Sequence, residues 1–214
     1  MRERVECDEM TTPWSHHNRS GARESTRRRE MIAVDSGRLG LSSSSMVTEV
    51  VTVRPAVRDD AGAIAAIYNA GIRGRGATFE TRERTAADIE AWFDRESHPI
   101  LVAERDGRVV GWAAASPYRA RECYAGIAEF SVYVDTAEHG RRIGDTLMTE
   151  FIPALEHAGF WKVLSRIFPE NTASRALCRR HGFREVGTYE RHARLDGVWR
   201  DVVIVERLLG EARR

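Results

Sequence analysis

The segment Val132–Leu147 contains the residues best suited to hold a phosphate group. It reads VYVDTAEHGRRIGDTL, so a β-branched stretch runs through a loop with Gly140 and Gly144 into a stretch with helical periodicity. A helix that begins directly after such a loop offers free backbone N–H groups and a positive dipole end, which favour a bound phosphate. Arg141 and Arg142 add positive charge. Two glycines also suit an ordinary strand-to-helix turn, so the segment alone leaves both interpretations open.

The overall composition argues against several other partners. The chain has 214 residues and a formal net charge of +1, which gives no sign of a nucleic-acid or membrane partner. No apolar run approaches the roughly 20 residues that span a bilayer. Cys7, Cys123 and Cys178 are odd in number and far apart, which fits neither a disulfide framework nor a spaced metal site. We therefore expect a cytoplasmic protein without a bound metal.

The first 45 residues differ in composition from the rest. They mix Arg, Glu, Ser and His with few apolar residues, and such a segment buries too little surface to offset the entropy of ordering. The adjacent His16 and His17 are better explained as solvated side chains than as metal ligands. A second methionine, Met46, stands before the first strand-like segment. We expect residues 1–45 to be a disordered tail or a mis-assigned start, and residues 46–214 to form one domain.

Periodicity and turn signals divide this domain into strands and helices in the order βααβββαβαββ. Alternating or β-branched runs indicate strands, and apolar residues at helical spacing indicate helices. We expect strands at 50–53, 100–104, 109–114, 127–134, 162–168, 183–194 and 199–207, and helices that begin near residues 59, 85, 141 and 172. This order predicts a mixed α/β unit with one sheet and helices on its faces.

Two of the predicted helices contain residues that disturb helical geometry. The third helix has an apolar stripe that includes Ile143, Leu147 and Phe151, and Pro153 should kink it or end its regular hydrogen bonding. Gly71, Gly74 and Gly76 should break the first helix and open a loop rich in glycine and arginine, from Gly71 to Thr78.

A second segment, Asn171–Phe183 (NTASRALCRRHGF), follows a predicted strand and begins the fourth helix. Together with Val132–Leu147 it resembles motifs A and B of the GNAT acetyltransferases, in the same order and at the same separation. The resemblance covers nearly all of residues 51–209. It implies the GNAT acyl-CoA N-acyltransferase fold, an α/β (α+β) fold in which a central mixed β-sheet with flanking helices has splayed strands that bind acetyl-CoA.

The same resemblance implies a set of cofactor-binding residues. The pyrophosphate of acetyl-CoA would lie on the loop from Gly140 to Asp145, and the pantetheine arm would extend along Val132–Val134. Arg142 stands where the family usually has glycine, and it fits there if its φ is negative. The implied set is Val132, Tyr133, Val134, Gly140, Arg141, Arg142, Ile143, Gly144, Asp145, Asn171 and Ser174.

Three further stretches resemble the phosphinothricin acetyltransferase branch, and within it the arsinothricin N-acetyltransferases. They are IYNAGI leading through Arg73 and Arg75 to ATFET, then PYRARECY, and finally GTYERH through DGVWRDV. The resemblance also implies a homodimer. It places the substrate beside Arg73, Arg75, Phe79, Arg119, Arg121, Tyr124 and His192.

The four arginines in this set make chemical sense for such a substrate. A glutamate analogue with a phosphinate or arsinate carries two anionic ends and one amine. The planar fork of arginine holds such oxyanions with paired, charge-assisted hydrogen bonds. In a chain this rich in arginine, we expect one or two of the four to be ordinary surface residues. A lone strand histidine such as His192 is also more often structural.

Acetylation of an amine needs a proton acceptor and a donor that stabilises the developing oxyanion. The resemblance gives Glu129 the role of base, although a strand-edge carboxylate in a salt bridge is a serious alternative. The backbone N–H near Tyr133 is the candidate oxyanion donor. Cys178 stands where many family members have the tyrosine that reprotonates the thiolate, and a packed small side chain explains it better. Tyr189 or water is then left as the acid.

The sequence therefore favours an acetyl-CoA-dependent N-acetyltransferase for a small anionic amino acid, as in detoxification of phosphinothricin or arsinothricin. Other acceptors remain open, namely methionine sulfoximine or sulfone, a polyamine, an aminoglycoside and a protein amine. The arginines near the predicted site disfavour the polycationic acceptors. A non-catalytic acyl-CoA-binding module is the alternative from a different class.

Overall fold

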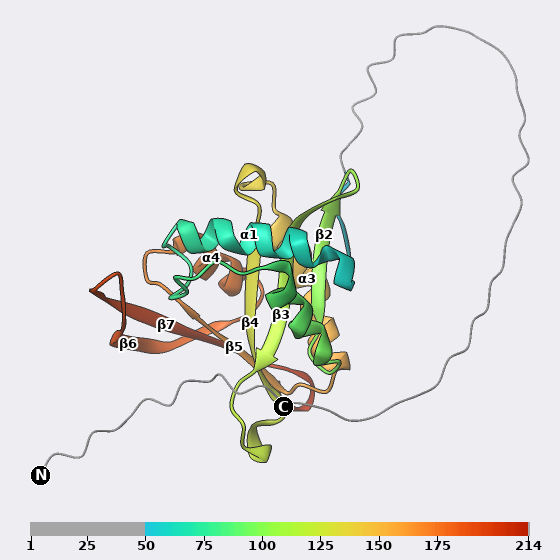
Figure 1. The fold of residues 1–214 in the computed structure, drawn as a ribbon. Helices are drawn as coiled ribbons and strands as arrows, with labels where there is room; N and C mark the ends of the chain where they lie inside the picture. The colour runs from blue at the N-terminus through green and yellow to red at the C-terminus, as the bar shows by residue number, and fades with distance from the viewer. Residues whose placement is uncertain (1–49, 214) are drawn as a thin grey trace, which may run out of the picture. The chain divides into compact units, whose positions relative to one another are not determined.

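A seven-stranded mixed sheet organises residues 50–213, which are the residues that the computed structural model describes (Figure 1). The strand order is β1-β2-β3-β4-β5-β7-β6. All neighbours are antiparallel except β4 and β5, which run parallel. The strands are β1 (Thr52–Pro55), β2 (Ile100–Arg105), β3 (Arg108–Pro117), β4 (Ile127–Val134), β5 (Lys162–Ile167), β6 (Arg184–Leu195) and β7 (Val198–Leu208). The predicted tail, residues 1–45, lies outside the described residues.

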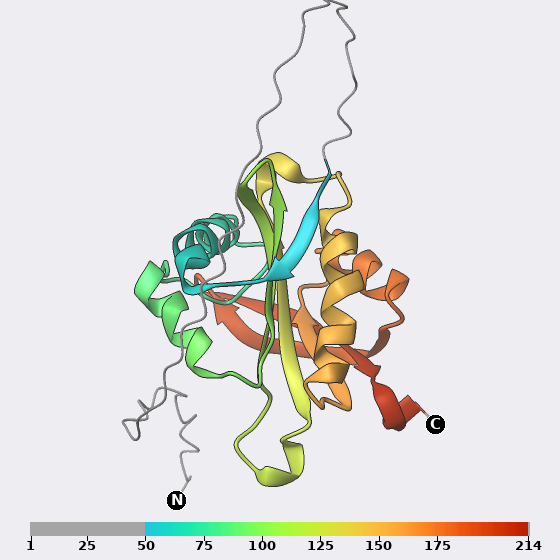
Figure 2. The same ribbon diagram turned by 90° about the vertical axis from the view of Figure 1, so that its right-hand side faces the viewer.

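Helices cover both faces of this sheet (Figure 2). One face carries α1 (Ala61–Arg73) and α2 (Ala86–Glu90), and the other carries α3 (Ile143–His157) and α4 (Thr172–Arg180). Short 3-10 turns lie between these elements, at Arg58–Asp60, Ala91–Asp94, Glu122–Tyr124, Thr136–Glu138 and Gly210–Arg213. The element order and the mixed sheet agree with the sequence prediction.

Two hydrophobic clusters fill the space between the sheet and its helices. Phe151 and Leu155 of α3 are fully buried on one face, and Ile64 of α1 packs with Trp112 of β3 on the other. Full burial of each such side chain contributes about 1.5–3 kcal/mol. Because side chains alternate along a strand, β4 contributes Phe130 to the α3 cluster, whereas its odd-numbered residues face α1 and α2.

The structure tests two sequence expectations about helix ends. Pro153 does not end α3, which continues to His157, because the proline lies on the exposed side while Ile152 and Leu155 hold the last turn against the core. The first helix does end at the predicted Gly74, its C-cap, but Gly71 lies inside α1 and does not break it. A Cβ atom there would lie 2.5 Å from the ring of Tyr133, so the glycine is what lets α1 approach β4 closely.

Candidate active site

Strands β4 and β5 part in the middle of the sheet. They pair only from Ile127 with Lys162 to Glu129 with Leu164, although β4 continues to Val134 and β5 to Ile167. Beyond Glu129, β4 is therefore paired with β3 on one edge only, and its other edge has no strand beside it. This is the splay that the sequence resemblance implies.

The backbone groups that face this gap belong to alternate residues of β4. The N–H of Lys162 donates to the carbonyl of Gly126 at 3.3 Å, and that of Asp135 donates to the carbonyl of Val110 of β3 at 2.9 Å. Even-numbered residues of β4 consequently point toward β5 and odd-numbered ones toward β3. The free N–H groups in the gap are those of Val132 and Val134. Among the N–H groups near Tyr133, those of Val132 and Val134 therefore face the gap, whereas that of Tyr133 itself faces β3.

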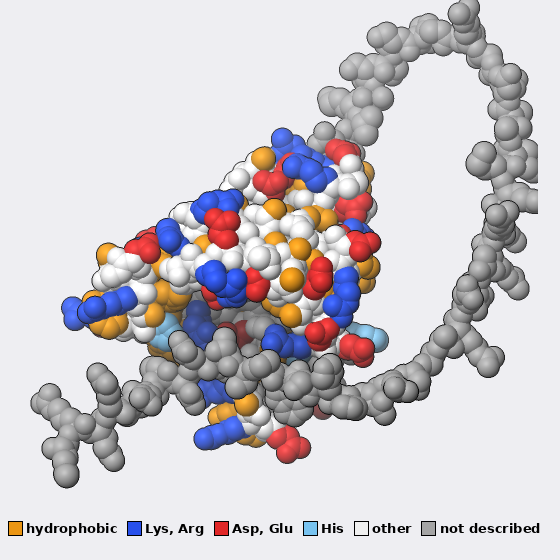
Figure 3. Space-filling view, viewed as in Figure 1, with side chains coloured by type: hydrophobic (Ala, Val, Ile, Leu, Met, Phe, Trp, Pro, Cys, Tyr) orange, Lys and Arg blue, Asp and Glu red, His pale blue; other side chains and the backbone are white. Residues whose placement is uncertain are grey.

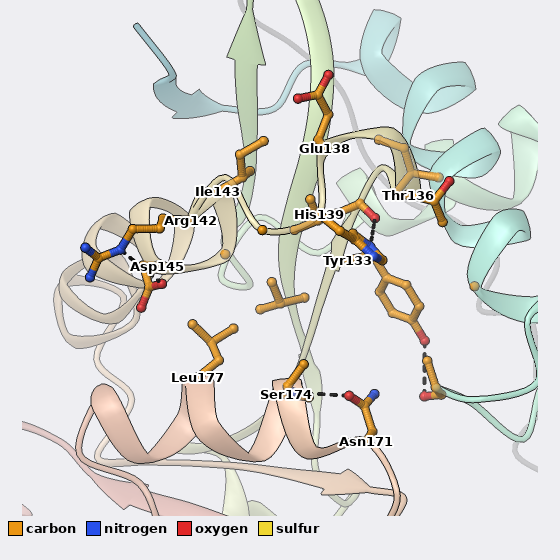
Figure 4. A pocket seen from close by; sticks show the side chains of 18 of the residues that line it. Tyr133, Thr136, Glu138, His139, Arg142, Ile143, Asp145, Asn171, Ser174 and Leu177 are labelled. Carbon is orange, nitrogen blue, oxygen red and sulfur yellow. Dashed lines mark hydrogen bonds and ion pairs between the residues drawn. The ribbon is translucent and has the colours of Figure 1, made fainter. Parts of the chain in front are cut away.

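A cavity of about 490 Å³ lies along this open edge, between β4, the loop before α3 and the start of α4 (Figure 4). It is lined by ten of the eleven predicted cofactor residues, that is, by all except Arg141. Instead, the guanidinium of Arg141 lies 3.5 Å from Glu138. The sequence reasoning thus brought together one wall of a real cavity from two segments about 30 residues apart.

Arg142 adopts the left-handed conformation at the start of α3, with φ of 60°. The condition under which arginine would fit this position easily, a negative φ, is therefore not met. Arginine therefore occupies a backbone conformation that favours glycine, at the position where the family usually has glycine. Its side chain is 81% exposed and lies 3.9 Å from Asp145, so that contact contributes little.

Glu138 anchors the loop from inside the protein and was missed by the sequence reasoning. Its side chain is 3% exposed and forms ion pairs with Arg105 and, at 2.9 Å, with Arg108. These two arginines flank the tight turn between β2 and β3. In the sequence, the only sign of these ion pairs was the presence of an arginine on each side of Asp106–Gly107. Nothing in that pattern indicated that their partner is Glu138.

Two of the predicted cofactor residues make contacts that shape the cavity. The side chain of Asn171 caps α4 by accepting from the N–H of Ser174 at 3.1 Å, and Figure 4 shows this pair across the cavity from Tyr133. Asp145 accepts from Arg180 at 2.8 and 3.0 Å, which holds the pKa of its carboxyl below the usual value. Asp145 therefore links α3 to α4.

Glu129 lies where β4 and β5 part, on the face covered by α1 and α2. Its carboxylate accepts two hydrogen bonds from Arg166 at 2.7 and 2.9 Å. Burial nevertheless raises the pKa of Glu129, and the positive charges of Arg166 and Arg119 offset part of this rise. The salt bridge that the sequence left as an alternative is present, and it does not exclude the role of a base.

The remaining predicted substrate residues fall into separate groups. Arg75 pairs with Asp196 at 3.0 Å, and Phe79 contacts Phe168 and His192, with ring centroids 4.9 and 6.1 Å apart. This first group lies beside the β6–β7 hairpin.

The second group lies at the connection between β3 and β4. Arg119 stacks on Tyr118 and Tyr124, with its guanidinium carbon 5.0 and 6.0 Å from the ring centroids, and Arg121 is exposed nearby in the sequence. Arg73 belongs to neither group and pairs with Glu83 at 2.8 Å. None of the predicted substrate residues lines the 490 Å³ cavity.

The candidates for the general acid differ strongly in their surroundings. Cys178 is 2% exposed within the core, and burial raises the pKa of its thiol to about 12. This agrees with the expectation of a packed side chain. Tyr189 is 54% exposed and lies against His192.

Metal and membrane signals are absent from the part of the chain that the structure describes. Residues 50–213 contain no group of three His, Cys, Asp or Glu side chains placed to hold a metal ion. None of the helices in that range has the length and apolarity needed to cross a membrane. On the face in Figure 3, basic and acidic side chains are interspersed rather than segregated, as the net charge of +1 would suggest.

Comparisons with known proteins agree with this geometry. Residues 64–183 match the model of the acetyltransferase (GNAT) family. A phosphinothricin N-acetyltransferase of Streptomyces coelicolor is 34% identical over 170 residues, which cover 76% of this chain and 98% of that protein. An L-methionine sulfoximine/L-methionine sulfone acetyltransferase of Pseudomonas paraeruginosa is 31% identical over 166 residues, covering 76% and 96%. A phosphinothricin acetyltransferase from Sinorhizobium meliloti, solved with acetyl-CoA, matches with a TM-score of 0.71 at 30% identity, covering 75% of this chain and 89% of that one.

Proposed function

Since this chain belongs to the acetyltransferase (GNAT) family and is an N-acetyltransferase with acetyl-CoA as its co-substrate, we propose that it acetylates the α-amino group of a small anionic amino acid of the phosphinothricin or arsinothricin type. The observation that carries this proposal is the position of Glu129. A half-buried carboxylate with a raised pKa stands where β4 and β5 part, and the positive charges of Arg166 and Arg119 act on it. That arrangement suits an acceptor with an amine and anionic groups.

The residues present fit acetyl-CoA. Val132 and Val134 offer unpaired N–H groups along the gap, as an extended pantetheine arm requires, and the loop before α3 offers helix N-terminal N–H groups for phosphates. When bound, acetyl-CoA supplies the thioester acetyl group. The N–H of Val132, the residue before Tyr133, is the proposed donor to the acetyl oxygen.

Glu129 is the proposed proton acceptor, either directly or through a water molecule. The two hydrogen bonds from Arg166 fix its carboxylate and favour the ionised form, while burial keeps its pKa raised and nearer to neutral pH. Arg119 is the best placed of the predicted arginines to hold an anionic end, because it is the one whose charge reaches Glu129. Arg73 and Arg75 would first have to leave Glu83 and Asp196.

We also propose that the protein is a cytoplasmic homodimer. Large apolar side chains stay exposed on the β6–β7 hairpin, and this supports a second copy as their partner: Val186, Tyr189, Val198 and Trp199. Light scattering during size-exclusion chromatography tests the dimer.

The function is tested by following thiol release from acetyl-CoA with phosphinothricin, arsinothricin, methionine sulfoximine, spermidine and an aminoglycoside in parallel. We expect selective turnover of the phosphinate and arsinate amino acids. Methionine sulfoximine is the second candidate, since a relative that is 31% identical acts on it. Glu129→Gln should lower kcat by about 10²–10⁴, whereas Glu150→Gln, an exposed carboxylate on α3, should not. Saturable acetyl-CoA binding without turnover of any amine would instead support a non-catalytic module.

A further inference from the structure

A second cavity lies on the α1/α2 face of the sheet and contains none of the residues predicted for the substrate. Its volume is about 260 Å³. The floor is made by Trp112, Ser116 and Ser131 of β3 and β4, and the charged wall by Glu80, Arg84 and Arg95. The volume is below the range of pockets for drug-sized ligands, so the cavity suits a molecule as small as an amino acid.

This cavity is adjacent to Glu129. Ser131 is two residues from Glu129 along β4 and therefore lies on the same face, and Ser116 is the residue of β3 directly opposite Glu129. An amine bound in the cavity would consequently approach the gap between β4 and β5 from one face. The 490 Å³ cavity runs along the gap beside α3 and α4.

Two residues of the charged wall, Glu80 and Arg84, form an ion pair. Arg84 and Glu80 lie 2.6 Å apart with 25% and 38% of their side chains exposed. The backbone of Arg84 is tied to α1 by two hydrogen bonds with the side-chain amide of Asn69, at 2.8 and 2.9 Å. The loop therefore holds Arg84 in place before any ligand is bound.

The floor contains one large buried side chain. Trp112 is 1% exposed, and its indole N–H has no hydrogen-bond partner among the described residues. Arg95 adds a second positive charge to the lining.

We propose that this second cavity binds the acceptor amino acid by the α-ammonium and α-carboxylate groups that it carries on one carbon. Arg84 holds the α-carboxylate, and Glu80 holds the ammonium group. These two groups of opposite charge insert into the Glu80–Arg84 pair without adding net charge there, whereas a polycation or a simple amine leaves Arg84 without its anion. The assignment rests on the proposed function and makes Arg84 the residue that selects for an α-carboxylate.

The test compares phosphinothricin with its decarboxylated analogue, 3-aminopropyl(methyl)phosphinate, by the ratio of their kcat/KM values. Arg84→Gln should raise KM for phosphinothricin about 10- to 100-fold, as expected for the loss of a charge-assisted hydrogen bond. It should change KM for the analogue little. The preference for phosphinothricin over the analogue, measured as the ratio of their kcat/KM values, should therefore fall. For Arg84→Lys, KM for phosphinothricin should lie between the values for the natural protein and for Arg84→Gln, because lysine keeps the positive charge but lacks the planar fork of arginine.

Arg82→Gln is the matched control, because Arg82 is two residues away, exposed, paired with Asp88 at 3.1 Å and absent from the cavity lining. It should leave the ratio unchanged. Calorimetric titration of phosphinothricin into the protein gives the same comparison without turnover. If phosphinothricin is acetylated but Arg84→Gln leaves the ratio unchanged, the cavity assignment is overturned and the proposed function stands. If no amino acid is acetylated or bound, both are overturned.

Discussion

Arg142 offers a direct way to measure the strain in the loop before α3. A residue with a Cβ atom pays roughly 1–2 kcal/mol for a left-handed backbone, and Arg142 has φ of 60°. Glycine removes that cost, but its greater conformational freedom in the unfolded chain lowers the free energy of unfolding by about 0.5–1 kcal/mol. The exposed contact with Asp145 at 3.9 Å is worth close to nothing. We therefore expect Arg142→Gly to stabilise the protein by about 0.5–1 kcal/mol.

For a protein of this size such a gain corresponds to a rise in Tm of about 1–4 °C. Arg142→Ala separates conformation from charge, because it removes the guanidinium but keeps a Cβ atom in the same backbone conformation. Alanine should therefore give no gain in stability. The measurement is chemical denaturation of the three proteins in parallel, supported by thermal unfolding.

The two variants should behave alike toward the cofactor. Both lose one exposed positive charge from the lining of the acetyl-CoA cavity, so KM for acetyl-CoA should rise about twofold in each, which corresponds to roughly 0.5 kcal/mol. Equal stability of the glycine and alanine variants would refute the argument from strain. A glycine variant less stable than the natural protein would show that Arg142 makes a contact stronger than its exposure suggests.

Two further predictions follow from β4 and its neighbours. Gly71→Ala should destabilise the protein, because the new Cβ atom would lie 2.5 Å from the ring of Tyr133. Gly62→Ala in the same helix meets nothing within 4 Å and should stabilise the protein by about 0.5–1 kcal/mol. Urea denaturation measures both changes in stability, and equal effects of the two substitutions would contradict the close approach of α1 to β4. Activity should fall as the pH drops through the raised pKa of Glu129, since the base must be ionised. Arg166→Gln removes groups that lower this pKa, so the acidic limb of kcat/KM should move to higher pH, and an unmoved limb would argue that Glu129 is not the base.

The sequence predicted the elements, and brought together residues that line the larger cavity, because both depend on local signals. Strand alternation located β4, the stripe of Ile143, Leu147 and Phe151 located α3, and two motifs placed acetyl-CoA against the residues that line the larger cavity. Each of these signals lies within one stretch of about 15 residues. Such a stretch fixes its own geometry, so the prediction needed no knowledge of contacts between distant elements.

The acceptor side was harder to predict because it depends on contacts between distant elements. Arginines that looked free in the sequence turned out to be paired, such as Arg73 with Glu83 and Arg75 with Asp196. The lining of the second cavity combines Arg84 from the loop before α2 with Trp112 and Ser131 from two strands. No spacing in the sequence connects these residues. Even the sign of φ at Arg142 depended on how the loop meets α3.

The splay between β4 and β5 has a consequence for the rate at which amide protons exchange with solvent. Ser131 and Tyr133 donate toward β3 and should exchange slowly, whereas Val132 and Val134 face the gap and should exchange quickly. The free protein would then show protection with a period of two along one strand at the centre of its sheet. Bound acetyl-CoA would slow the fast pair and leave the slow pair as it was. Hydrogen exchange along these four residues would thus report, amide by amide, which backbone groups the cofactor occupies.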